Sequence, residues 1–197
     1  MSKKILVLAP HTDDGELGCG GTIARYIGKG YHVKYVAFSS PLPELEGELH
    51  NATSILGIKD VTVLDFPIRR FNGVRQDILE LLYGLWNDYD PTIVFLPSKN
   101  DVHQDHHVIY QEGLRAFKKT KMLSYELPWN NIEFMGQYFV PIAGKHLEKK
   151  LLALKEYKTQ KDRDYFQVDF IKSLAKVRGV QMGKEYAECF EVVRWVV

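Results

Sequence analysis

The sequence predicts an α/β fold in which a mostly parallel, doubly wound sheet carries helices on both faces, giving three αβα layers. Short apolar runs alternate with longer amphipathic stretches from residue 5 to residue 118, which is the pattern of repeated strand and helix units. The first run, residues 5–9, is continuously apolar, as expected for a parallel strand covered on both faces. Right-handed crossovers between such strands produce a Rossmann-like sheet.

The first four strands and the helices between them follow from local signals. Three glycines at positions 18, 20 and 21 lead into a helix at residues 22–27, and Gly28 and Gly30 end that helix. A second helix stops at Gly57, because glycine suits the left-handed conformation that ends helices. The other predicted elements are strands at residues 32–38, 61–64 and 92–96, helices at 46–56, 74–87 and 108–118, and loops at 39–45, 65–73 and 97–102.

The last third of the chain has a less regular pattern. The predicted elements there are strands at residues 122–126, 136–140 and 190–197 and helices at 145–157 and 164–177. The sequence contains no internal repeat and no linker-like segment. We therefore expect one domain over residues 1–197.

Composition narrows the class of protein. The 197 residues are 45% hydrophobic and 26% charged, and no apolar run approaches the roughly 18 residues of a spanning helix. The N-terminal apolar stretch ends at His11 and therefore indicates a strand rather than a signal peptide. A formal charge of +1 argues against nucleic acid or anionic lipid as a partner. Two distant cysteines indicate no disulfide framework, and a reducing cytoplasm is the simplest location.

Polar side chains with metal-binding chemistry follow the first and fourth predicted strands. His11, Asp13 and Asp14 come directly after residues 5–9, and residues 103–107 include three histidines and an aspartate after residues 92–96. In the common strand order 3-2-1-4 these two strands are neighbours, and ligands bind beyond their carboxyl ends. The sequence therefore predicts that the two clusters face each other.

Two histidines and one carboxylate provide the three protein ligands of a catalytic Zn²⁺ site, although other divalent first-row metals remain compatible with this donor set. A structural alternative is that Thr12 or Asp13 only caps a helix and that His103 lies at a solvated helix start. That alternative leaves the meeting of two histidine and aspartate clusters without an explanation.

Two motifs resemble the signatures of the PIG-L/LmbE-like deacetylase family. The first is His11-Thr12-Asp13-Asp14 followed by Glu16-Leu17-Gly18-Cys19-Gly20-Gly21-Thr22, and the second is His103-Gln104-Asp105-His106. The similarity covers nearly the whole chain, because residues 52–57, 178–179 and 186–190 also resemble family features. Either motif alone is moderately specific, and the pair at this separation is specific.

The resemblance implies a zinc hydrolase that removes an N-acetyl group from an N-acetylglucosamine-type conjugate, such as a nucleotide sugar, a glycolipid or a glycosylated metabolite. It implies Asp13 as the general base on a zinc-bound water and His103 as the group that protonates the leaving amine or stabilises the oxyanion. Asp105 would orient His103. The zinc ligands implied by position are His11, Asp14 and His106. Relatives are often oligomers, so a homo-oligomer is expected by analogy.

Substrate contacts are less well indicated. Many family members carry a basic residue before the segment that corresponds to residues 52–57, whereas residues 41–50 contain no lysine or arginine. Arg69 and Arg70 are candidate replacements that would bind a phosphate or a sugar hydroxyl, and a surface salt bridge is the alternative. Tyr125 and Trp129 would form an aromatic wall for a sugar ring, or they only mark the exit of a strand.

Three other functions compete with deacetylation of an amino sugar. A zinc amidase that cleaves a longer acyl chain or a non-sugar amide would use the same chemistry. A non-catalytic module that binds a metal or a sugar would need no base. A nucleotide-dependent enzyme is disfavoured because residues 18–21 lack the spaced glycine fingerprint and nearby acids would repel a pyrophosphate.

Overall fold

A single seven-stranded sheet organises the chain in a computed structural model that describes residues 3–196. The strands lie in the order β3-β2-β1-β4-β5-β7-β6. The first five in that order are parallel, and β7 runs antiparallel to both of its neighbours. The strands are β1 (Lys4–His11), β2 (His32–Ser39), β3 (Asp60–Val63), β4 (Ile93–Leu96), β5 (Lys121–Tyr125), β6 (Tyr138–Ile142) and β7 (Tyr186–Arg194).

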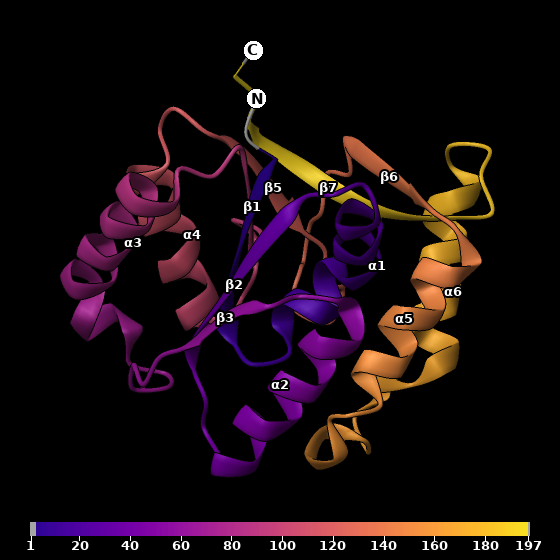
Figure 1. Ribbon diagram of the computed structural model, residues 1–197, viewed down its shortest axis with the longest axis horizontal. Helices are drawn as coiled ribbons and strands as arrows, with labels where there is room; N and C mark the ends of the chain where they lie inside the picture. The colour runs from indigo at the N-terminus through magenta and orange to yellow at the C-terminus, as the bar shows by residue number, and fades with distance from the viewer. Residues whose placement is uncertain (1–2, 197) are drawn as a thin grey trace.

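Helices cover both faces of this sheet, which confirms the predicted αβα layers. Helices α3 and α4 lie on one face and α1, α2, α5 and α6 on the other (Figure 1). The helices are α1 (Asp14–Gly28), α2 (Pro43–Leu56), α3 (Arg75–Tyr89), α4 (Gln104–Ala116), α5 (Gly144–Leu154) and α6 (Val168–Val180). Three short 3₁₀ turns, Phe71–Val74, Lys158–Gln160 and Asp164–Phe166, complete the regular structure.

Strand β1 is buried on both faces. Ile5 and Val7 belong to the core beneath α1, α2, α5 and α6, whereas Leu6 and Leu8 belong to the core beneath α3 and α4. None of these four side chains is exposed. The continuous apolar run in the sequence therefore has a direct cause, because successive strand residues point to opposite faces and both faces are covered.

Several element boundaries differ from the prediction. Helix α2 begins at Pro43, inside the predicted loop 39–45, because proline is well tolerated in the first helical turn. Gly57 ends it with φ of 93°, as predicted. Helix α6 begins at Val168, since the preceding 3₁₀ turn takes up part of the predicted helix. Strand β7 starts and ends earlier than residues 190–197, and residue 197 lies outside the described residues.

The glycine-rich stretch that was predicted to precede the first helix lies inside α1. The helix is kinked at Cys19, whose φ of −144° and ψ of 20° are not helical. Glu188 of β7 accepts hydrogen bonds from the backbone N–H groups of Gly21 (3.0 Å) and Thr22 (2.6 Å) just after the kink. The carboxylate therefore acts as a cap for the second half of α1, at the point where N–H groups lack helical partners.

A buried lysine completes this arrangement from the other side. The Lys150 ammonium of α5 donates to the Leu17 carbonyl (2.6 Å) and pairs with Glu188 (2.7 Å). Gly18 is needed at the same place, because a Cβ there would lie 2.5 Å from the ring of Tyr125. The first helix is thus locked to β5, β7 and α5 directly after the polar cluster that it carries.

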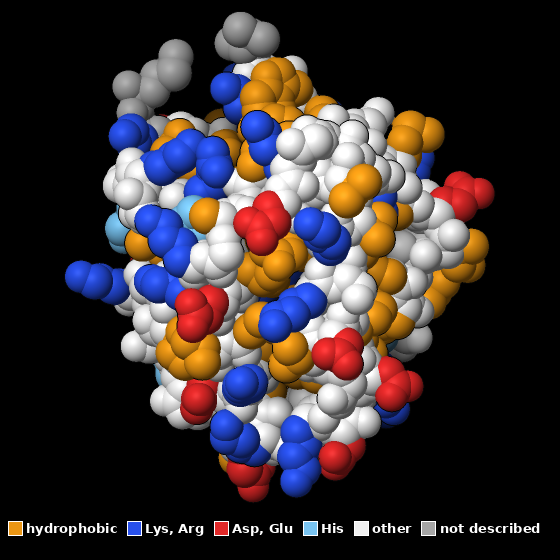
Figure 2. Space-filling view, turned by 90° about the vertical axis from the view of Figure 1, so that its right-hand side faces the viewer, with side chains coloured by type: hydrophobic (Ala, Val, Ile, Leu, Met, Phe, Trp, Pro, Cys, Tyr) orange, Lys and Arg blue, Asp and Glu red, His pale blue; other side chains and the backbone are white. Residues whose placement is uncertain are grey.

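The surface shows no strong segregation of charge on the side that α5 and α6 occupy. Basic and acidic side chains alternate with apolar ones across that face (Figure 2). Among residues 3–196, the helices lack the combined length and apolar character that crossing a bilayer requires.

Replacing Glu188 with alanine is expected to destabilise the fold by about 3–5 kcal/mol, because the Lys150 ammonium would remain buried without its charged partner. Equilibrium urea unfolding measures this change. Glu185→Ala, at an exposed position on the same segment, should change the free energy of unfolding by no more than about 0.5 kcal/mol. Equal effects of the two substitutions on the free energy of unfolding would show that the buried ion pair does not contribute to stability as proposed.

Candidate functional site

The two polar clusters meet at the carboxyl ends of β1 and β4. These strands pair in parallel, with Leu6 opposite Val94 and Val7 opposite Phe95. His11 is the last residue of β1, and His106 lies in the first turn of α4. The predicted juxtaposition follows from this pairing, because parallel neighbours end at the same edge of the sheet.

Three donor atoms form a nearly equilateral triangle at this edge. Asp14 Oδ2 lies 3.3 Å from His11 Nδ1 and 3.2 Å from His106 Nε2, and the two nitrogens are 3.2 Å apart. Ligand bonds of about 2.0–2.1 Å in a tetrahedral site place donor atoms about 3.3 Å apart. The triangle therefore fits a small divalent cation bound by these three side chains.

Each histidine of the triangle is backed by a buried carboxylate on its other ring nitrogen. His106 Nδ1 lies 2.7 Å from Asp101 Oδ2, and His11 Nε2 lies 3.2 Å from Asp105 Oδ2. Such contacts fix the ring orientation and leave the opposite nitrogen free to bind a metal. This second layer of carboxylates is characteristic of histidine metal sites and supports the fit of the donor set to a cation.

Asp101 was missed in the sequence, where it lies within the predicted loop 97–102. Its other oxygen accepts a hydrogen bond from the backbone N–H of His103 (2.8 Å), which also fixes the start of α4. An aspartate two residues before a histidine at a helix start is the local signal that would have found it, because aspartate commonly bonds to the backbone two residues on.

Asp105 does not have the predicted contact. Its carboxylate lies against His11 and accepts from the backbone N–H groups of Arg69 (2.6 Å) and Phe71 (3.3 Å). The backbone N–H of Asp105, not its side chain, reaches His103, at 3.2 Å from Nδ1. The expectation that this carboxylate orients His103 is therefore corrected: the helix start directs the side chain toward β1 instead.

The electrostatic balance of the triangle favours a positive charge. Burial alone would lower the pKa of His106, but the charge of Asp14 and the hydrogen bond with Asp101 raise it to about 10. The pKa of His11 also rises against its burial, to about 9, through contacts with Asp105 and Asp14. Burial opposes ionisation of Asp14, yet the two imidazoles hold its pKa well below the usual range. A cation is thus well matched to this cluster.

Asp13 and His103 line the same cavity as the residues of the triangle. Burial, followed by the neighbouring charge of Asp14, raises the pKa of Asp13 to about 6. Burial and the adjacent His106 and His11 lower the pKa of His103. Because His103 Nδ1 accepts from the Asp105 backbone, a neutral His103 carries its proton on Nε2. The adjacent acids of residues 13 and 14 thus have different environments.

These side chains line one cavity of about 480 Å³, a size typical of small-molecule sites. Its lining combines the metal triangle with apolar, aromatic, amide and cationic groups. The residues are His11, Thr12, Asp13, Asp14, Leu17, Pro41, Leu42, Leu45, Ile68, Arg69, His103, His106, Trp129, Asn130, Gln160, Arg163 and Tyr165. Of the four predicted substrate contacts, Arg69 and Trp129 are therefore placed at the cavity.

The other two predicted substrate contacts lie elsewhere. Tyr125 is fully buried, and its hydroxyl donates to the Leu8 carbonyl (3.0 Å). Its ring has no face for a sugar because it packs against Gly18 of α1. Arg70 is exposed but is not part of the cavity lining. Both assignments are corrected: the side chain of Tyr125 enters the core between sheet and helix, and of the two adjacent arginines only Arg69 lines the cavity.

Several cavity residues come from a segment that the sequence did not connect with the site. Gln160, Arg163 and Tyr165 lie between α5 and α6, more than a hundred residues from the first cluster. The Tyr165 ring stacks on Trp129 with ring centroids 4.0 Å apart and an angle of 10° between planes. No local signal marks these residues, because only the packing of the last third of the chain brings them to the sheet edge.

Two buried tyrosines form hydrogen bonds with the turn that carries the first cluster. The Tyr157 hydroxyl lies 2.6 Å from the Thr12 carbonyl oxygen and 2.8 Å from Glu16 Oε1. The Tyr35 hydroxyl contacts the same carbonyl and the same carboxyl group. Burial raises the pKa of Glu16 to about 8, although both tyrosine contacts oppose the rise. This network holds the backbone between the predicted ligand and the predicted base.

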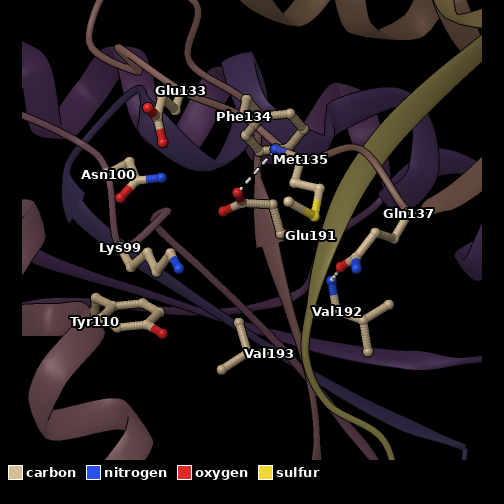
Figure 3. Close-up of a pocket in the computed structure, with 10 residues that line it drawn as sticks. All are labelled: Lys99, Asn100, Tyr110, Glu133, Phe134, Met135, Gln137, Glu191, Val192 and Val193. Carbon is tan, nitrogen blue, oxygen red and sulfur yellow. Dashed lines mark hydrogen bonds between the residues drawn. The ribbon is translucent and has the colours of Figure 1, made fainter.

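A second cavity, of about 590 Å³, lies beside the loop that carries Asp101 (Figure 3). It is lined by Lys99, Asn100, Tyr110, Glu133, Phe134, Met135, Gln137, Glu191, Val192 and Val193. Glu191 is buried there and accepts from Ser98 Oγ (2.6 Å) and the Met135 backbone (3.0 Å). Among the described residues, its lining includes no histidine and none of the predicted site residues, so it lacks the donor set of the smaller cavity.

Comparison with known proteins identifies the family of this chain. Residues 6–117 match the family model described as PIG-L, GlcNAc-PI de-N-acetylase. The chain belongs to the PIG-L family. A relative from Escherichia coli, the uncharacterized deacetylase YaiS, is 31% identical over 169 residues, which cover 80% of this chain and 91% of the relative.

Two further comparisons extend this likeness beyond the matched residues. The diacetylchitobiose deacetylase of Thermococcus kodakarensis is 26% identical over 221 residues, covering 94% of this chain and 81% of that protein. The crystal structure of the conserved protein TT1542 from Thermus thermophilus superposes with a TM-score of 0.86 at 28% identity, covering 100% of this chain and 97% of that one. The relatives from Escherichia coli and Thermococcus kodakarensis are both named deacetylases, which supports an amide-hydrolysing enzyme.

Replacing Asp101 with asparagine is expected to weaken metal binding about 10- to 100-fold, because His106 would lose the carboxylate that orients it and raises its basicity. Titration of chelator-treated protein with Zn²⁺ against a competing chromophoric chelator measures the change. Asp88→Asn, at an exposed position on α3, is the matched control and should bind as the parent does. An unchanged affinity in the Asp101 variant would remove this residue from the site.

Proposed function

We propose that this PIG-L family chain is a zinc-dependent N-deacetylase that removes the acetyl group from an N-acetylglucosamine-type conjugate. The observation that carries the proposal is the triangle of His11, Asp14 and His106, which lines one cavity together with Asp13 and His103. The names of the relatives support acetyl transfer to water as the reaction and an amino sugar as the substrate.

His11, Asp14 and His106 would hold the metal, with Asp105 and Asp101 keeping the two imidazoles in position. A zinc ion in such a site supplies a Lewis acid that polarises a carbonyl oxygen and lowers the pKa of water toward about 7. The donor set of two nitrogens and one carboxylate oxygen is the kind that leaves a catalytic zinc open to a further ligand. Other divalent first-row metals fit the same donors.

The remaining chemistry belongs to residues of the chain. Asp13 removes a proton from the attacking water as its oxygen adds to the amide carbon, and charge then develops on the former carbonyl oxygen. His103, with its proton on Nε2, donates to that oxygen or to the nitrogen as the C–N bond breaks. The amine leaves with the added proton, and acetate is the second product.

The shape and lining of the cavity support an amino sugar. The Trp129 and Tyr165 rings provide an aromatic surface beside the metal triangle, and the amides of Asn130 and Gln160 are suited to sugar hydroxyls. Arg69 is the predicted cationic contact that reaches the cavity. A zinc amidase for a longer acyl group or a non-sugar amide is the alternative within the same chemistry.

The free, buried Cys19 and Cys189 fit the expected reducing cytoplasm.

The proposed base is tested by replacing Asp13 with asparagine in zinc-loaded protein. Acetate release from a panel of N-acetylglucosaminides should fall about 10²- to 10⁴-fold, because the carboxylate that takes the proton is lost. Bound zinc, measured by atomic absorption, should stay at the parent level. His11→Ala and His106→Ala should lose both zinc and activity.

The controls separate this enzyme from the alternatives. Removal of zinc by a chelator should abolish acetate release, and addition of zinc should restore it. Activity of the Asp13 variant equal to that of the parent would show that the base is wrongly assigned. Release of longer acids, but not of acetate, would favour the amidase, and no release from any amide would favour a binding module.

A further inference from the structure

Asp13 stands at the N-cap position of α1, but its carboxylate is not used as a cap. Aspartates at this position commonly accept a hydrogen bond from a backbone N–H group in the first helical turn. Within residues 3–196 the Asp13 side chain forms no capping hydrogen bond, and it lines the cavity beside the metal triangle instead. The place of this carboxylate in the cavity is therefore set by the backbone that carries it.

The backbone is held on both sides of Asp13. On the helical side, the Asp13 carbonyl oxygen accepts a hydrogen bond from the Leu17 N–H group (3.0 Å). On the other side, the Thr12 carbonyl oxygen lies 2.6 Å from the Tyr157 hydroxyl, and the hydroxyl must donate because a carbonyl oxygen only accepts. The peptide unit is planar, so a hydrogen bond that fixes the Thr12 carbonyl also fixes the nitrogen and Cα of Asp13.

Tyr157 comes from a distant part of the chain that also forms a wall of the cavity. It lies between α5 and the 3₁₀ turn Lys158–Gln160, and it is 1% exposed. Its ring packs edge-on against Phe166, with centroids 5.8 Å apart and 65° between the planes. Phe166 directly follows Tyr165, which stacks on Trp129 at the cavity. One buried side chain thus contacts the peptide of the proposed base and the segment that bears the aromatic surface.

The metal triangle is held by contacts of its own. His11 is oriented by Asp105 and His106 by Asp101, and both carboxylates are buried. The hydrogen bonds described for the Tyr157 hydroxyl go to neither histidine and to neither of these carboxylates. Loss of the hydroxyl would therefore leave the metal ligands in place while releasing the peptide before the base.

We propose that Tyr157 is a positioning residue for the general base, because its hydroxyl holds the Thr12–Asp13 peptide and so sets the place of the Asp13 carboxylate. The inference rests on the proposed deacetylase function and adds a residue that acts on the reaction without lining the cavity. A carboxylate takes a proton efficiently only within hydrogen-bond reach of the attacking water, so a small shift of the peptide lowers the rate. Tyr35 contacts the same carbonyl at 3.2 Å, so the peptide keeps a weaker support and the loss of rate is partial.

The first test is the kinetics of Tyr157→Phe in the zinc-loaded full chain, with N-acetylglucosaminides as substrates. Acetate release should show a kcat about 10- to 100-fold below that of the parent, because the base is displaced from the attacking water. KM should stay near the parent value, since the phenyl ring keeps its packing against Phe166 and the aromatic surface keeps its place. Zinc affinity, measured by titration against a competing chelator, should also be unchanged. All rates are expressed per bound zinc, so that unfolded chains do not count.

A double variant tests whether Tyr157 acts through the base. In the Asp13→Asn protein the base is absent, so the addition of Tyr157→Phe should cause no further loss of kcat. Single-turnover reactions with the enzyme in excess measure these slow rates. Losses that multiply in the double variant would show that the tyrosine acts by another route and would overturn the inference.

Tyr89→Phe is the matched control. The Tyr89 hydroxyl also contacts a backbone carbonyl oxygen, that of Ile5 in β1 (3.1 Å), but at the opposite end of the strand from His11. Urea unfolding of both variants compares their stabilities, and Tyr89→Phe should keep the kcat of the parent. An equal fall of kcat in both variants would show that loosening of the sheet, rather than the position of the base, lowers the rate, and would overturn the inference.

A kcat of Tyr157→Phe equal to that of the parent would overturn the inference and leave the deacetylase intact. A fall of kcat accompanied by weaker zinc binding or a raised KM would also overturn it, because the hydroxyl would then act on the metal triangle or on the aromatic surface. Absence of acetate release from every glycoside in the parent, by contrast, would overturn the proposed function and the inference that rests on it.

Discussion

The site depends on the two buried carboxylates that lie behind the histidines of the metal triangle. Asp101 and Asp105 come from the same short segment at the end of β4, yet they support different imidazoles, one on α4 and one at the end of β1. Without them His11 and His106 would be free to rotate, and both imidazoles would lose contacts that raise their pKa values against the effect of burial. The carboxylates fix which nitrogen of each ring faces inward, and the meeting of two parallel strands thereby becomes a binding site for a cation.

The turn after β1 also needs support, because its polar side chains contribute little to the core. Residues in the last third of the chain supply that support. Tyr157 reaches the Thr12 carbonyl oxygen, and the pair of Lys150 and Glu188 supplies hydrogen-bond partners at the kink of α1. The family match ends at residue 117, so the predicted ligands all lie within it while these supports lie beyond it. The predicted metal ligands therefore lie in the first two thirds of the chain, whereas side chains that hold them in place come from the last third.

This division explains what the sequence could and could not predict. The layers follow from periodicity, and the meeting of the two polar clusters follows from their places at strand ends in the common strand order, because these signals are local in the sequence. The choice of His11, Asp14 and His106 within the clusters came from the family resemblance. Arg163 and Tyr165 gave no signal, since their approach to the cavity depends on how α5 and α6 pack. The prediction that Tyr125 contacts the substrate was wrong for a different reason. An aromatic residue at a strand end faces either the cavity or the core, and the absence of a side chain at Gly18 decides for the core.

Asp105 connects the metal centre with the mouth of the cavity. One of its oxygens contacts both His11 and the backbone of Arg69, and the other accepts from Phe71 at the start of the 3₁₀ turn after β3. A displacement of this carboxylate would therefore disturb a metal ligand and a cationic residue of the cavity lining together. The spacing between the metal and the Arg69 backbone is consequently set by one buried side chain rather than by a flexible surface loop.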